Sequence, residues 1–169
     1  LGMSNSDNIS LDTKNIDTIL VLDFGSQYTQ LIARRIRELN VFSVILPWDV
    51  SIEKIQSLNP MGVILSGGPE SVTESNTPRI PEIIFELDVP ILGICYGMQT
   101  LAEQFGGQVS SSKNKEFGHA EILLEKPSLL FDGFSSGSSI DVWMSHGDHV
   151  STLPDLSLIH ISEPTRRRG

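Results

Sequence analysis

Cysteine is almost absent from this 169-residue chain, which contains only Cys95. A single cysteine excludes an internal disulfide and any metal site built from several cysteine ligands. His146 and His149 have a spacing seen among zinc ligands, but catalytic zinc needs three protein ligands and the sequence offers no evident third. We therefore expect no metal site.

Long apolar runs and clustered basic residues are also scarce. No apolar run approaches the roughly 18 residues of a membrane-spanning helix, and the first fifteen residues are too polar for a signal peptide. The chain has 12 Lys and Arg against 21 Asp and Glu, a net charge of -9. A nucleic-acid surface needs clustered basic residues, and only Arg34, Arg35 and Arg37 and the terminal 166–168 group qualify. We expect a cytoplasmic protein that binds neither membrane nor nucleic acid.

Between residues 19 and 107, short apolar runs alternate with segments whose apolar residues recur every three or four positions. The runs predict strands covered on both faces, as in a parallel sheet, and the recurring segments predict amphipathic helices. The expected strands are 19–23, 41–46, 62–66 and 90–95, and the expected helices are 28–39 (with Ser26 as N-cap), 52–58, 80–87 and 98–105. This alternation predicts an α/β protein with an open, mostly parallel sheet flanked by helices.

The alternation stops after Gly107. Residues 117–124 and 140–144 predict two further strands joined by Ser- and Gly-rich links. We expect three regions along the chain: a disordered tail over 1–17, one partial domain over 18–155, and a segment over 156–169. The last segment does not continue the fold and ends in three arginines and a glycine, so we expect that it is not native sequence. No second domain is expected within this length.

The strongest local signal is Gly93-Ile94-Cys95-Tyr96-Gly97, which lies between a predicted strand and a predicted helix. That layout is typical of a nucleophile elbow, in which a tight turn holds the nucleophile above the end of a strand. Flanking glycines leave room for the turn, and a helix start beside the thiol favours the reactive thiolate. The alternative is a small buried apolar cysteine. We favour the nucleophile because the elbow layout is present.

A second signal, Ser66-Gly67-Gly68-Pro69, follows the third strand. A Gly-Gly turn there can direct backbone N–H groups into an oxyanion hole for acyl transfer, although a plain turn is the alternative. Both signals lie at carboxyl ends of strands, where ligands collect in open α/β sheets. Asp23-Phe24-Gly25-Ser26-Gln27, after the first strand, is expected to cap a helix, with the alternative that it reaches the site, and it lacks the spacing of a phosphate loop. His119 is expected to have no special role.

Four segments resemble class I glutamine amidotransferases, and among them the GMP synthetase family: 19–35, 64–71, 93–99 and 143–148. Gly-x-Cys-x-Gly marks the whole class, whereas the segments around Gln27 and Trp143 are similar to GMP synthetases. The resemblance covers residues 19–155. It implies a flavodoxin-like fold and a domain that hydrolyses glutamine to glutamate and ammonia.

The resemblance also implies roles for individual residues. Cys95 would attack the glutamine carboxamide and form a glutamyl thioester, and Gly68 and Tyr96 would supply oxyanion-hole N–H groups. The residues that would hold the glutamine are Gln99, Ser145, His146 and Gly147. The domain itself would need no cofactor. In the full-length family it works with an ATP pyrophosphatase domain, which uses ATP and Mg to activate xanthosine monophosphate (XMP) for conversion to GMP, and the protein is a homodimer.

In that family, the catalytic base and its orienting acid come from a His-Pro-Glu motif after the segment that matches 143–148. This sequence contains no such motif, and His160-Ile161-Ser162-Glu163 has the wrong spacing. Without a base, a thiol keeps little thiolate at neutral pH. We therefore expect that this chain is not an efficient glutaminase. The alternatives are a catalytically incomplete fragment that at most binds glutamine, a different class I amidotransferase, and a cysteine hydrolase or peptidase-like relative with the same elbow.

Overall fold

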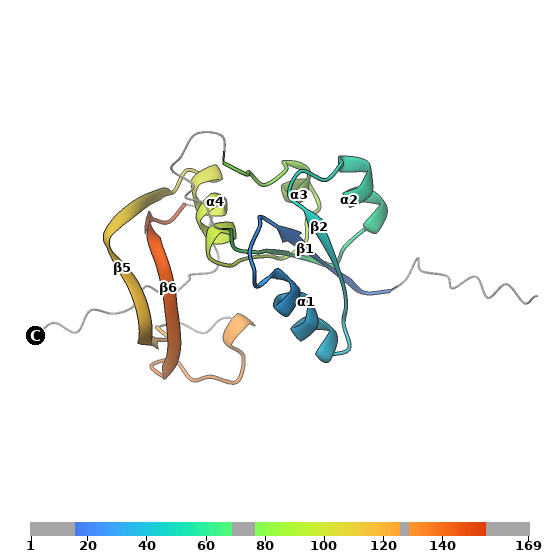
Figure 1. Cartoon of the computed structure of the whole chain (residues 1–169). Coiled ribbons are helices and arrows are strands. Elements are labelled where there is room, and N and C mark those ends of the chain that lie inside the picture. The colour runs from blue at the N-terminus through green and yellow to red at the C-terminus, as the bar shows by residue number, and fades with distance from the viewer. Residues whose placement is uncertain (1–15, 69–76, 126–128, 155–169) are drawn as a thin grey trace, which may run out of the picture.

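A computed structural model describes residues 16–68, 77–125 and 129–154. They form a four-stranded parallel sheet with helices and a separate two-stranded antiparallel sheet (Figure 1). The elements are β1 (Thr18–Asp23), α1 (Thr29–Glu38), β2 (Phe42–Pro47), α2 (Ile52–Leu58), β3 (Gly62–Leu65), α3 (Ile83–Glu86), β4 (Ile91–Gly93), α4 (Tyr96–Gln104), β5 (Gln108–Leu123), a short 3-10 helix (Leu129–Phe131) and β6 (Ser139–Thr152). The predicted segment 156–169 and most of the predicted tail 1–17 lie outside the described residues.

The strands of the parallel sheet are ordered β2-β1-β3-β4, the order of flavodoxin-like sheets. β1 lies between β2 and β3, so that Leu20 pairs with both Val44 and Val63. The consecutive residues Leu20, Val21 and Leu22 are completely buried. A strand covered on both faces is therefore the reason for the continuous apolar run, as predicted.

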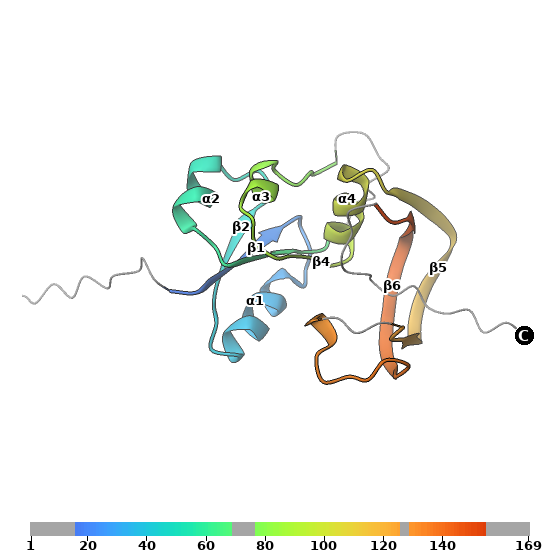
Figure 2. The ribbon, with the colours of Figure 1, turned by 180° about the vertical axis from the view of Figure 1, so that it is seen from behind.

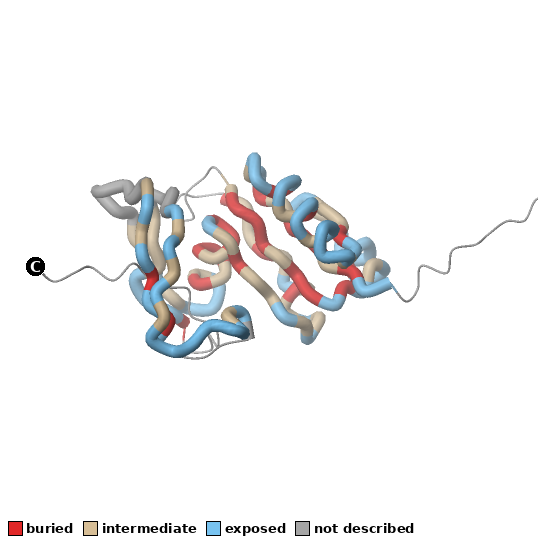
Figure 3. Tube along the Cα trace, turned by 90° about the horizontal axis from the view of Figure 1, so that it is seen from below, coloured by how far each residue is buried: buried red, intermediate tan, exposed pale blue. Residues whose placement is uncertain are grey.

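Helices cover both faces of this sheet. α1 lies on one face, while α2 and α3 lie on the other (Figures 1 and 2). Burial is concentrated in the sheet and in the start of α4 (Figure 3). The buried hydrophobic core joins the sheet to α2, α3 and α4, and consists of Leu20, Leu22, Phe24, Ile55, Val63, Leu65, Ile80, Ile84 and Tyr96. The predicted α/β class is confirmed.

Two helices differ from the sequence-based expectation. Tyr28, not Ser26, is the N-cap of α1, and Ser26 Oγ instead accepts a hydrogen bond from Tyr28 N at 3.0 Å. The buried residues of α1 are the small Thr29 and Ala33, whereas Leu31 on the predicted apolar stripe is 47% exposed. The helix predicted over 80–87 is shorter in the structure, where only Ile83–Glu86 (α3) is helical. Ile80 lies before α3 in irregular backbone, and its N–H donates to the side chain of Gln104 on α4.

The two predicted C-terminal strands are present but longer than expected. β5 and β6 form an antiparallel hairpin that pairs Gln108 with Thr152 at one end and Leu123 with Ser139 at the other. The hairpin lies beside α4 rather than extending the parallel sheet (Figures 1 and 2). α4 therefore separates the two sheets, and its first residues face both.

Candidate functional site

The turn between β4 and α4 holds Cys95 in an unusual backbone conformation. Cys95 is the N-cap of α4 and has φ 50° and ψ -116°. A positive φ is rare for a residue with a side chain, and such strain persists only where the surrounding structure imposes it. Cys95 is an exposed free cysteine. The predicted strand–turn–helix layout is present, with the side chain at the carboxyl end of the parallel sheet.

The glycines on either side of Cys95 permit this turn by close packing. A Cβ on Gly97 would lie 2.4 Å from the carbonyl oxygen of Leu65, and one on Gly93 would lie 2.7 Å from Met98 Cα. The N–H of Gly97 also donates to the carbonyl of Ser66 at 3.0 Å. The start of α4 is thus pressed directly onto the end of β3, which no larger residue would allow.

Two loops that are far apart in the sequence meet beside Cys95. A Cβ on Gly67 would lie 3.4 Å from both Cys95 Cβ and Ser26 Oγ, so Gly67 lies between Cys95 and the loop after β1. A Cβ on Gly68 would lie 3.3 Å from Tyr96 Cγ. The two residues expected to form an oxyanion hole are therefore neighbours, as the convergence of strand ends predicts. Their role as hydrogen-bond donors to a substrate stays a prediction.

A buried hydroxyl network lies behind these loops, and sequence reasoning missed it. Ser66 Oγ accepts a hydrogen bond from Phe24 N at 3.3 Å and lies 3.0 Å from Thr29 Oγ1. Thr29 Oγ1 donates to Asp23 Oδ1 at 2.8 Å, and Asp23 Oδ1 also accepts the N–H of Gly25 at 2.9 Å. Asp23 therefore closes the turn before α1 but does not cap the helix, because the N-cap is Tyr28 and α1 has no side-chain cap hydrogen bond, so the expected capping role is wrong. The available signal was a serine directly after a buried strand.

The electrostatics of Cys95 differ from the expectation. Although the residue is exposed, the surrounding protein removes part of the water around the thiol, and this desolvation raises the pKa of Cys95. The helix start is present as predicted, but the net direction is towards the neutral thiol. Within the described side chains, which do not include that of His146, no hydrogen bond or ion pair links Cys95 to a basic group.

The residues expected to hold a substrate come from α4 and β6. Gln99 is 6% exposed, and its Nε2 donates to the carbonyl of Asp148 at 3.2 Å. This contact joins α4 to β6 at Asp148, directly after the 145–147 segment. In the hairpin, Ser145 pairs with Phe117 and His146 with Glu116. The side chains of Ser145 and His146 lie outside the described part of the structure, so the substrate-binding roles stay predictions.

Other candidate features lie away from Cys95. His119 is exposed on β5 with its Nε2 3.0 Å from Asp141 Oδ1, an ordinary surface contact as expected. Over the described residues, no group of three His, Cys, Asp or Glu side chains could hold a metal ion. An open concavity of about 530 Å³ lies at the far end of α4 and is lined in part by Phe85 and Phe105. None of the helices in the described ranges has the length and apolar character of a membrane span.

Comparison with known proteins adds independent information. The family described as glutamine amidotransferase class-I matches residues 20–167. Glutamine-hydrolysing GMP synthases are 58% identical over 142 residues in Histophilus somni, 57% over 150 in Hamiltonella defensa and 54% over 161 in Teredinibacter turnerae. These alignments cover 81%, 84% and 90% of this chain. The chain spans only 27%, 29% and 31% of the respective relatives.

Solved structures agree with the fold. A Thermoplasma acidophilum protein, described provisionally as part of a GMP synthase, matches with a TM-score of 0.67 and 34% identity. The match covers 83% of this chain and 70% of that one. A glutamine amidotransferase from Methylobacillus flagellatus has a TM-score of 0.60 at 19% identity, covering 83% of this chain and 58% of its own, and shows the shared fold alone. The strained cysteine turn, the glycine loop beside it and these matches lead to one conclusion: the chain belongs to the class-I glutamine amidotransferase family.

Proposed function

We propose that this chain is the glutamine-hydrolysing unit of a GMP synthase, releasing ammonia for the amination of XMP to GMP. The observation that carries the proposal is that Gly67 packs against Cys95, whose backbone has a strained, positive φ in the turn between β4 and α4. The printed names of its relatives support the choice of GMP synthase over other amidotransferases. In this proposal Gln99, Ser145, His146 and Gly147 hold the glutamine.

The reaction begins when the Cys95 thiolate attacks the carboxamide carbon of glutamine. A C–S bond forms and the carbonyl electron pair moves to oxygen, where the N–H groups of Gly68 and Tyr96 stabilise the negative charge. The C–N bond then breaks as the nitrogen gains a proton and leaves as ammonia. Water hydrolyses the resulting γ-glutamyl thioester to glutamate and frees the thiol.

Two of these steps need a proton carrier. A base must take the thiol proton, and an acid must deliver a proton to the leaving nitrogen. The raised pKa of Cys95 makes the first step harder, and the sequence contains no His-Pro-Glu motif to supply the carrier. The proposal is therefore that this chain by itself binds glutamine and hydrolyses it slowly.

The remaining parts of the proposal concern partners. The ammonia is passed to an ATP pyrophosphatase domain that uses ATP and Mg, and the complete protein is a cytoplasmic homodimer. These statements rest on the GMP synthetase resemblance, and the relatives named as GMP synthases are more than three times as long as the matched region. Copurification of the chain with a separately expressed pyrophosphatase domain would test the partnership.

Labelling of the single cysteine tests the substrate. A chloromethyl ketone analogue of glutamine should add once to Cys95, with loss of chloride, and glutamine should slow the addition while asparagine should not. Mass spectrometry of the intact chain and its peptides reads both results. Labelling that glutamine does not slow contradicts the proposal. Ammonia release from glutamine at a substantial rate that Cys95→Ala abolishes would contradict the expected slow turnover.

A further inference from the structure

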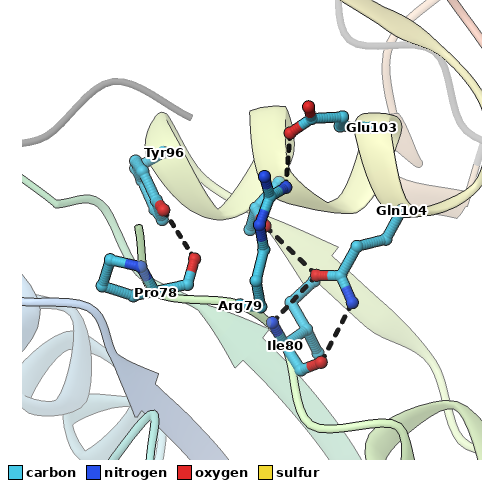
Figure 4. Close-up of polar contacts among 7 residues, drawn as sticks. Pro78, Arg79, Ile80, Tyr96, Glu103 and Gln104 are labelled. Atoms are coloured by element: carbon cyan, nitrogen blue, oxygen red, sulfur yellow. Dashed lines mark hydrogen bonds and ion pairs between the residues drawn. The ribbon is translucent and has the colours of Figure 1, made fainter. Parts of the chain in front are cut away.

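The irregular segment over residues 78–80 runs along α4 and is held by its side chains (Figure 4). The Tyr96 hydroxyl donates to the carbonyl of Pro78 at 2.6 Å. Further along the helix, Gln104 reaches both backbone groups of Ile80 (Figure 4): its Oε1 accepts the N–H at 2.9 Å and its Nε2 donates to the carbonyl at 3.0 Å. An ion pair between Arg79 and Glu103 lies beside these contacts.

Gln104 supplies both backbone hydrogen bonds of Ile80, which a neighbouring strand would otherwise supply. Ile80 is buried in the main core, and buried backbone groups need hydrogen-bond partners. The orientation of the Gln104 amide is consistent with a third contact, because Thr100 Oγ1 donates to the same Oε1 at 3.1 Å. The contact between 78–80 and α4 is therefore a specific bridge rather than loose packing.

Tyr96 joins this bridge to the site. Its ring is 2% exposed and packs against Phe24, with the ring centroids 5.4 Å apart. A Cβ added to Gly68 would lie 3.3 Å from Cγ of Tyr96. Tyr96 thus contacts Gly68, which follows β3, and bonds to Pro78, which precedes α3. It is also the residue directly after Cys95.

We propose that the Tyr96 side chain and Gln104 are positioning residues for the oxyanion hole. The bond to Pro78 and the paired bonds to Ile80 fix the Tyr96 ring against Gly68, and this holds the backbone N–H groups of Gly68 and Tyr96 at a set spacing beside Cys95. The proposal rests on the proposed function, in which these two groups stabilise the oxyanion. Such donors act by being preorganised, so a small displacement weakens them.

The test compares two reagents on the single cysteine of the 169-residue chain. The chloromethyl ketone analogue of glutamine occupies the substrate site, and its carbonyl is polarised by the two N–H groups while sulfur displaces chloride. Iodoacetamide also forms a C–S bond, with loss of iodide, but is too small to be held in the site. The ratio of the two rates cancels any change in the thiolate fraction. The inactivation constant and the half-saturating reagent concentration are measured separately.

Tyr96→Phe removes one oxygen atom and keeps the ring and the backbone N–H, and Gln104→Met keeps the volume but loses both bonds to Ile80. Each should lower the rate ratio roughly ten-fold through the inactivation constant, with the half-saturating concentration nearly unchanged. Gln56→Met, on the exposed face of α2, is the matched control and should leave the ratio unchanged. Circular dichroism and the iodoacetamide rate show whether each variant is folded, and Tyr96→Phe decides the matter if Gln104→Met does not fold.

The outcomes separate two failures. If the unmodified chain reacts with the glutamine analogue no faster than with a chloromethyl ketone that lacks the amino-acid part, the proposed function fails and the positioning role fails with it. If the unmodified chain prefers the analogue but Tyr96→Phe and Gln104→Met keep its rate ratio, the positioning role alone is overturned. A loss confined to the half-saturating concentration would also overturn it, because that result reports weaker binding rather than displaced donors.

Discussion

The Oγ1 atom of Thr29 lies 3.0 Å from the Oγ atom of Ser66, and this contact joins the first residue of α1 to the end of β3. Both side chains are buried. Thr29 follows the loop after β1 and Ser66 begins the loop after β3, and these two loops meet beside Cys95. The spacing of the loops therefore depends on a pair of hydroxyl groups that themselves lie behind the site.

Ser66→Ala should lower the free energy of unfolding by about 1–3 kcal/mol, because it leaves the buried N–H of Phe24 without its partner. Urea unfolding followed by circular dichroism measures the change. The control is Ser57→Ala, whose exposed hydroxyl donates to Lys54, and it should cost less than about 0.5 kcal/mol. Equal effects of the two substitutions would contradict the structural role of Ser66.

Gly97→Ala should destabilise the chain by about 3 kcal/mol or prevent folding, since the new Cβ would lie 2.4 Å from the Leu65 carbonyl oxygen. Backbone cannot move aside there without separating α4 from β3. Gly62→Ala is the matched control, because its Cβ would meet the flexible end of Ile19 at 3.2 Å. Thermal unfolding of both variants should show a much smaller loss for Gly62→Ala, and the reverse order would refute the packing explanation.

The reactivity of Cys95 should depend on pH in a defined direction. Desolvation raises the pKa of the folded thiol, so the iodoacetamide rate should reach half its maximum at a higher pH than it does in urea-unfolded chain. Between the two midpoints the folded protein retains a proton that the unfolded chain has lost. Stability should therefore decrease as the pH rises past the unfolded midpoint, and Cys95→Ala should remove that part of the decrease. A folded midpoint below the unfolded one would contradict this.

Trp143 on β6 is 77% exposed, so Trp143→Ser should change the free energy of unfolding by less than about 0.5 kcal/mol. Its fluorescence should be strongly quenched by acrylamide. Ile122, on the paired strand, is buried and provides the contrast: Ile122→Ala should cost about 2–5 kcal/mol. A large loss with Trp143→Ser would mean that the indole is covered in solution.

Sequence reasoning located the strands well because a buried strand leaves a local pattern. The run from Ile19 to Leu22 is apolar at successive positions, and β1 extends one residue beyond the strand predicted over 19–23. Helix α1 was less predictable. Its buried face consists of Thr29 and Ala33, small residues that allow close approach to the sheet, and apolar periodicity alone pointed to Leu31 instead.

The turn at Cys95 was predictable from the chain alone, because glycine spacing between a strand and a helix is a local property. Gly93 and Gly97 indicated the turn, whereas the role of Cys95 as a nucleophile rests on the resemblance and stays a prediction. Contacts between segments that are distant in the sequence were not predicted, because they depend on how the elements pack together. The Thr29–Ser66 bond, the reach of Gln104 to Ile80 and the net upward shift of the Cys95 pKa depend on which surfaces meet and how much water they exclude. No local pattern carries that information, because burial is set by residues many positions away.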